Sequence, residues 1–81
     1  MNELQKQYLK LNMANCMTDS GKKLQIGVEA YGLDEPIEWR SDNEQVATVD
    51  GNGLVTAHSH GDAMITALSG QSRAVCRVSV D

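Results

Sequence analysis

The fold of this chain is decided by residues Ile37 to Asp81, which read IEWRSDNEQVATVDGNGLVTAHSHGDAMITALSGQSRAVCRVSVD. Apolar and polar residues alternate here in short stretches, and glycine-containing turns separate the stretches. A period of two is typical of a β-strand with one buried face. The pattern predicts strands over residues 37–40, 46–49, 54–57, 63–67 and 74–80. Asp50-Gly51-Asn52-Gly53 predicts a tight hairpin, because these residues tolerate positive φ.

The first 36 residues add two further strands to this pattern. Leu9 and Leu11 alternate with polar neighbours, and residues 24–30 form the most regular alternation in the chain. Turn-forming residues follow at positions 18–21 and 32–36. Short strands at turn spacings of about 8 to 12 residues are typical of a sandwich. We therefore predict an all-β, immunoglobulin-like β-sandwich of about seven short strands in two packed sheets.

Residue types along the C-terminal half resemble, in order and spacing, those of the group 2 bacterial immunoglobulin-like domain. The matching positions are Trp39 and Ser41, Val46 to Asp50, Gly53 to Ala57, Gly61 with Ile65 to Ala67, and Val78 to Val80. The first 36 residues match the family more loosely. The resemblance implies an immunoglobulin-like fold and a non-catalytic spacer or adhesive module. It also implies an origin on a bacterial surface or on a phage capsid or tail, where members of the family occur.

The inward positions of the predicted strands identify a candidate core. Its members are Leu24, Ile26, Val28, Trp39, Val49, Val55, Ile65, Val78 and Val80. Trp39 shares its phase with Ile37 and is therefore expected between the sheets rather than on the surface as a platform for sugar stacking. Besides Trp39, the aromatic residues are Tyr8 and Tyr31, so the sequence supports glycan binding only weakly.

Cys16 and Cys76 are the two cysteines of the chain, and they allow at most one internal disulfide. Cys76 lies in phase with Val78, which predicts a small buried hydrophobic residue. The resemblance offers an alternative, since the first and last strands of an immunoglobulin-like sandwich can run side by side and bring the two thiols together. Such a bond would be structural, whereas a chain without a secretory signal is expected to keep its thiols reduced.

His58 and His60 form a His-x-His pair, but two ligands are too few for a zinc site, and we expect a loop here. The turn at residues 50–53 lacks the acidic ladder of a calcium loop. No serine lies in a Gly-x-Ser-x-Gly elbow, and adjacent histidines do not form a triad. We predict no catalytic residue, no metal site and no cofactor.

Negative charge concentrates around the third predicted strand and its loops. The residues are Asp34, Glu35, Glu38, Asp42 and Glu44. A solvated face explains the cluster most simply, and a docking face for a basic protein partner is the alternative.

Length and charge bound the remaining choices. A chain of 81 residues supports one core, which we place over residues 8–81, and residues 1–7 read as a flexible lead-in or a docking arm. The net charge is −4 and the seven Lys and Arg residues are scattered, which argues against nucleic acid. No apolar run of about 20 residues is present, so membrane insertion is not expected.

The first functional hypothesis is a decoration protein on a bacteriophage virion, bound to a capsid or tail protein and making weak multivalent surface contacts. It follows from the resemblance and from a start that lacks a secretory signal. The alternative is a repeat of a secreted bacterial adhesin or cell-surface protein that acts as a spacer or adhesive domain. An enzyme is not expected under either hypothesis.

Overall fold

The computed structural model describes residues 8–33 and 35–81, and all of its regular secondary structure in these residues is β. The strands are β1 (Tyr8–Leu11), β2 (Asn15–Thr18), β3 (Lys23–Gln25), β4 (Val28–Tyr31), β5 (Glu38–Ser41), β6 (Ala47–Val49), β7 (Leu54–Ala57), β8 (Gly61–Ser69) and β9 (Ser72–Val80). The predicted all-β class is confirmed. The predicted arm, residues 1–7, and the acidic residue Asp34 lie outside the described residues.

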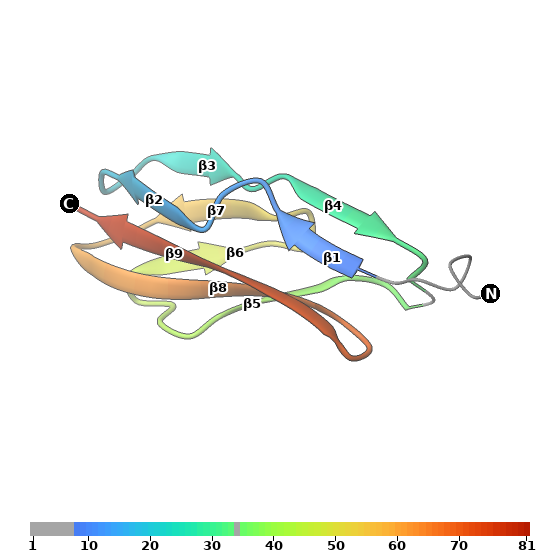
Figure 1. Cartoon of the computed structure of the whole chain (residues 1–81). Coiled ribbons are helices and arrows are strands. Elements are labelled where there is room, and N and C mark those ends of the chain that lie inside the picture. Colours follow the sequence, from blue (N-terminus) through green and yellow to red (C-terminus); the bar gives the residue numbers. More distant parts are fainter. Residues whose placement is uncertain (1–7, 34) are drawn as a thin grey trace.

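The strands form two layers of an immunoglobulin-like sandwich (Figure 1). One layer is a four-stranded sheet in the order β2-β9-β8-β5. The other joins a three-stranded ladder, β3-β7-β6, to the β1-β4 pair, because β4 continues the chain direction of β3. All pairs are antiparallel except β2 and β9, which run parallel.

The structure has nine strands where the sequence predicts about seven, because each of the first two predicted strands is divided by a bend. The bend between β1 and β2 contains Asn12, and the bend between β3 and β4 contains Gly27. These two residues are bonded to each other: the Asn12 N–H donates to the Gly27 carbonyl (2.9 Å) and the Gly27 N–H donates to Asn12 Oδ1 (3.1 Å). The paired bends carry β1 and β4 away from β2 and β3.

The core is filled by the inward side chains of both layers. Of the predicted core, Ile26, Val55, Ile65, Val78 and Val80 are buried. Leu24, Trp39 and Val49 are partly buried and pack against them. Six further residues are buried beside them: Leu9, Val46, Ala47, Ala57, Ala63 and Ala67.

Val28 is a correction to the predicted core, since its side chain is 40% exposed. The prediction treats residues 24–30 as one continuous strand, but the bend at Gly27 ends β3 and places Val28 on β4. There it lies opposite Leu11 in a two-stranded ladder, and every residue of β4 is exposed.

The β6–β7 hairpin brings the second layer against Trp39. Asp50 Oδ1 accepts the N–H groups of Asn52 (2.8 Å) and Leu54 (3.0 Å), which closes the predicted turn. Gly53 ends it with φ +82°, and a Cβ there would lie 2.8 Å from Trp39 Cζ2. The tryptophan ring therefore packs on a glycine backbone, so closely that a Cβ at position 53 would force the ring or the backbone to move.

The molecule is elongated, with principal extents of 48 × 17 × 15 Å. β1 begins toward one end of the long axis, and Asp81 lies at the other end (Figure 1). The first described residues thus lie toward one end of the sandwich, and the last residue lies at the opposite end.

Candidate interaction site

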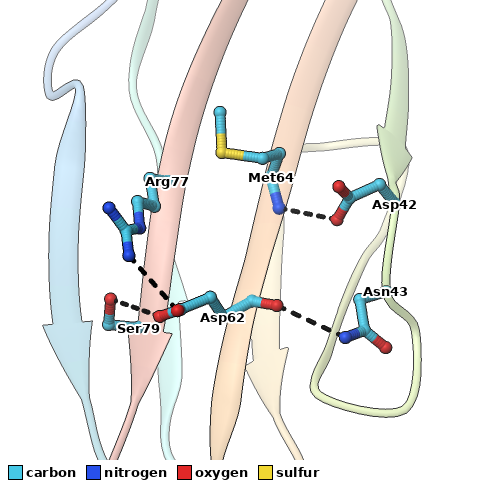
Figure 2. Close-up of polar contacts among 6 residues, drawn as sticks. All are labelled: Asp42, Asn43, Asp62, Met64, Arg77 and Ser79. Atoms are coloured by element: carbon cyan, nitrogen blue, oxygen red, sulfur yellow. Dashed lines mark hydrogen bonds and ion pairs between the residues drawn. The ribbon is translucent and has the colours of Figure 1, made fainter.

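The outward face of the β2-β9-β8-β5 sheet carries a cluster of polar contacts, drawn in Figure 2. We call it the Asp62 cluster, and its members are Asp42, Asn43, Asp62, Met64, Arg77 and Ser79. Strand alternation places it: even-numbered residues of β8 and odd-numbered residues of β9 point outward, and most of the residues between them are buried in the core. The antiparallel register sets Asp62 opposite Ser79 and Met64 opposite Arg77.

Asp62 is the centre of the cluster. Its carboxylate accepts the Ser79 hydroxyl (2.8 Å) and the Arg77 guanidinium (3.2 Å), and its carbonyl accepts the Asn43 amide (3.4 Å). The Ser79 hydroxyl, followed by the Arg77 guanidinium, lowers the pKa of Asp62. Because Arg77 and Asp62 are both more than half exposed, at 55% and 56%, solvent screens this ion pair and its contribution to stability is small.

The loop after β5 is fastened to the same face. The Met64 N–H donates to Asp42 Oδ1 (2.8 Å), and the Asp42 N–H donates back to the Met64 carbonyl (3.1 Å). These bonds extend the β5–β8 pairing past the end of β5 and hold the loop against β8. The cluster therefore joins β8, β9 and the loop after β5 through polar contacts among its own members.

A hollow of about 220 Å³ adjoins the Asp62 cluster at the end of the molecule where Asp81 lies. Its lining includes His60, Asp62, Ser79 and the side chain of Met17, which is 83% exposed on β2. The volume is below the roughly 300–1,000 Å³ of small-molecule sites.

The chemistry expected of an active site is not assembled in the described residues. The Ser79 hydroxyl donates to a carboxylate, and those of Ser41, Ser59 and Ser69 donate to backbone carbonyls. The His58 ring pairs with the Thr48 hydroxyl at 2.9 Å. No three His, Cys, Asp or Glu side chains within residues 8–33 and 35–81 lie together as metal ligands.

Cys16 and Cys76 are both free thiols, so the disulfide considered from the sequence is not formed in the structure. The structure does place β2 beside β9, but the register sets Cys16 opposite Val78 and leaves Cys76 two residues away. Two such positions on neighbouring strands lie about 8 Å apart, and a disulfide requires roughly 7 Å or less. Burial raises the pKa of the Cys76 thiol, and the nearby Cys16 raises it further.

The predicted acidic docking face is spread over separate parts of the molecule. Glu35 lies beside Gly70 at the β8–β9 turn, whereas Glu44 is in the loop at the other end of β5. Between them, Glu38 is paired with Arg40 at 3.1 Å. Asp42 is bonded to β8 as described above, and all four side chains are exposed. The acidic residues that the structure describes do not form one continuous patch.

The chain matches the profile of the bacterial Ig-like domain (group 2) over residues 18–78. It belongs to this family. The match begins at the end of β2 and extends nearly to the end of β9, so it includes β3 to β8 and the whole of the hairpin against Trp39.

Two intimins are similar in sequence to this bacterial Ig-like domain. It is 35% identical to intimin of Citrobacter freundii over 49 residues, which are 60% of this chain and 5% of that protein. It is 39% identical to intimin of Escherichia coli O157:H7 over 51 residues, which are 63% of this chain and 6% of that protein. The chain thus spans about a twentieth of the length of the intimins that it matches.

Solved structures share the fold. A C-terminal 282-residue fragment of intimin, in complex with the intimin-binding domain of the translocated intimin receptor, superposes with a TM-score of 0.73 at 17% identity, covering 89% of this chain and 30% of that one. Domains 5–6 of the S-layer protein SbsC give 0.77 at 19% identity, covering 94% and 45%. No helix in the described residues is long and apolar enough to cross a membrane.

Proposed function

We propose that this bacterial Ig-like domain is a non-catalytic spacer or adhesive domain of a bacterial surface protein. Its family and its similarity to intimins support this assignment. These relatives favour the surface-protein alternative over the virion hypothesis, for which they provide no support. The virion assignment stays a prediction from the sequence.

The observation that carries the proposal is the direction of the chain through an elongated sandwich. The long axis, 48 Å, is nearly three times the next extent of 17 Å. The described chain enters near one end of this axis and leaves at the other (Figure 1). A domain built in this way adds its full length to the polypeptide that contains it, which is what a spacer requires.

The partner that we propose is a protein. The intimin fragment was solved bound to the intimin-binding domain of a receptor, which is a protein partner of a relative with this fold. The surface that we propose for such a contact is the Asp62 cluster with the neighbouring hollow at the Asp81 end. Contacts made there would be polar and salt-sensitive, because Asp62, Arg77 and Asp42 are exposed.

The test is to find where the polypeptide with this sequence is located in its source. Surface-exposed, secreted, cytosolic and virion fractions are digested with trypsin, and peptides of this domain are identified by mass spectrometry together with the mass of the intact parent. Recovery from the surface or secreted fraction in a larger parent with further strand-rich repeats would support the proposal. Recovery as a short chain in many copies from purified particles would overturn it and favour the virion hypothesis.

A further inference from the structure

Asn52 and Gly53 form the single Asn-Gly step of the sequence, and they lie at the tip of the β6–β7 hairpin. Asparagine is a thermally labile residue. It is most labile before glycine, because glycine has no Cβ to obstruct an attack by its own backbone nitrogen on the asparagine side chain. The hairpin therefore contains the asparagine of this chain that is most prone to deamidation.

The hairpin fixes the backbone on both sides of Asn52. The Asp50 N–H donates to the Leu54 carbonyl and the Gly53 N–H donates to the Asp50 carbonyl, each at 3.1 Å, which leaves a loop of residues 51–53. Gly53 has φ +82°, whereas Asn52 does not have a positive φ. A three-residue hairpin loop of this kind is a type I turn followed by a bulge. Asn52 occupies the third position of that turn, where ψ is about 0°.

This value of ψ keeps the Gly53 nitrogen away from the Asn52 side chain. At a ψ of about 0° the Gly53 nitrogen is eclipsed with the backbone nitrogen of Asn52. The side chain leaves the Cα atom in a different direction, so the Gly53 nitrogen and Asn52 Cγ do not meet. The Gly53 N–H is also bonded to the Asp50 carbonyl, and Gly53 is buried against Trp39. Reaction between Gly53 and the Asn52 side chain thus requires the hairpin to open.

Two side chains hold the hairpin closed around Asn52. Asp50 Oδ1 accepts the N–H groups of Asn52 and Leu54, and Gln25 Nε2 donates to the Asn52 carbonyl at 2.9 Å. The Leu54 N–H, followed by the Asn52 N–H, lowers the pKa of Asp50, so this acceptor is ionised at neutral pH. The peptide group on each side of Asn52 is therefore bonded to a side chain.

We propose that Asn52 is a modification site gated by the fold: the closed hairpin protects it, and opening of the hairpin exposes it to deamidation. In the open hairpin, the Gly53 nitrogen bonds to Asn52 Cγ while the bond from Cγ to Nδ2 breaks, and ammonia leaves with the proton of the Gly53 amide. Water then opens the cyclic imide at one of its two carbonyl carbons. The products are aspartate and isoaspartate at position 52.

The isoaspartate product does not fit the closed hairpin. Its main chain passes through Cβ and Cγ and is one methylene longer, which shifts the Gly53 N–H relative to the Asp50 carbonyl that accepts it. The shift also displaces Gly53 from Trp39, which packs directly on it. A domain that has opened is thus marked irreversibly at position 52. The inference goes beyond the proposed function, because it depends on the hairpin alone.

Peptide mapping by mass spectrometry tests the gate on the full chain, incubated at one neutral pH in buffer and in urea. The signal is the sum of aspartate and isoaspartate at position 52, and a synthetic peptide of residues 49–55 corrects for the effect of urea on the chemistry. A reaction that passes through the open hairpin follows the open fraction. We expect at least about a tenfold slower conversion in buffer, which corresponds to about 1.4 kcal/mol of opening free energy. Equal corrected rates would overturn the proposal.

Two variants outside the Asn-Gly step test whether the hairpin is the gate. Asp50→Ala removes the acceptor of the Asn52 and Leu54 N–H groups, and Gln25→Ala removes the donor to the Asn52 carbonyl. In buffer we expect both to convert about two- to tenfold faster than the parent, because each loses hydrogen bonds of the closed state. In urea they should match the parent.

Asp19→Ala is the control, since Asp19 is an exposed acidic residue in the turn after β2. It should convert Asn52 at the rate of the parent in both solutions. Far-UV circular dichroism before incubation shows which variants are folded, and if Asp50→Ala is unfolded, Gln25→Ala decides the result. A folded Gln25→Ala variant that converts no faster in buffer than Asp19→Ala would contradict the gate.

Discussion

Gly53→Ala is the substitution that tests the contact between the two layers most directly. Gly53 has φ +82°, where a residue with a Cβ costs about 1–2 kcal/mol. The added methyl would also lie 2.8 Å from Trp39 Cζ2, 3.0 Å from Cη2 and 3.1 Å from the Ile26 carbonyl oxygen, so the ring or the backbone must move. Overpacking of this kind costs about 1–3 kcal/mol.

The two contributions together predict a loss of about 2–5 kcal/mol. A chain of this length has a stability of about 4–12 kcal/mol, so the variant should be severely destabilised. Gly21→Ala is the matched control. Gly21 has nearly the same backbone angle, φ +86°, but a Cβ there meets nothing within 4 Å. The control therefore isolates the backbone cost from the collision with Trp39.

Urea unfolding followed by far-UV circular dichroism measures both variants without depending on tryptophan fluorescence. We expect Gly53→Ala to lose about 1–3 kcal/mol more than Gly21→Ala. In a Trp39→Leu background this excess should shrink, because the nearest obstructing atoms have been removed. If Gly53→Ala and Gly21→Ala lose the same stability, the inferred packing of the ring on the hairpin is wrong.

Three further predictions concern the core, the Asp62 cluster and the thiols. Trp39→Ala should cost about 3 kcal/mol or more, because a large core side chain is lost; an unchanged melting temperature would remove Trp39 from the core. The pKa of Asp62 is lower in the folded protein than in the unfolded chain, where it is about 4. The ionised carboxylate therefore stabilises the fold above about pH 4, and this stabilisation is lost as the pH falls through the folded-state pKa. Stability should therefore decline less steeply on acidification below about pH 4 in Asp62→Asn than in the parent, and parallel pH profiles would contradict the role given to Asp62. An alkylating reagent should modify the half-buried Cys16 before the buried Cys76, whose pKa is raised, whereas in urea the two should react alike; equal rates in the native protein would contradict the burial of Cys76.

The C-terminal strands could be predicted because their signals are local. β8 and β9 alternate inward and outward over nine residues each, and residues 50–53 supply the turn chemistry of the β6–β7 hairpin. Trp39 could be placed between the layers from its phase alone. Such patterns depend on neighbours in the sequence, so one chain is enough to identify them.

The N-terminal half was harder to predict because its structure depends on distant partners. β2 is only four residues long, and its place is set by parallel pairing with β9, some sixty positions away along the chain. The bend at Gly27 is held by the Asn12 side chain, which replaces a backbone acceptor. An asparagine and a glycine fifteen positions apart carry no period, and so residues 24–30 looked like one continuous strand.

The surface was predictable only where strand alternation sufficed. Glu38 and Arg40 are two residues apart on β5, and their pairing could have been inferred from that spacing. The bond between Asp62 and Ser79 depends on the register of β8 with β9, which the intervening turn determines. Counting acidic residues along the sequence gives neither such partners nor the positions of the acidic side chains in the fold, so the docking face stays a prediction.

The divided N-terminal strand joins both layers and closes a sheet edge. β1 pairs with β4 in one layer, and β2 pairs with β9 in the other, so residues 8–18 fasten the layers together at one side. Without β2, the edge of the nine-residue β9 would present unpaired N–H and C=O groups, which invite pairing with another chain. At the opposite edge of the same sheet, β5 carries the charged residues Glu38 and Arg40, which discourage such pairing. One short strand thus protects the sheet from a neighbouring copy, so loss of β2 should bring aggregation through the exposed edge of β9.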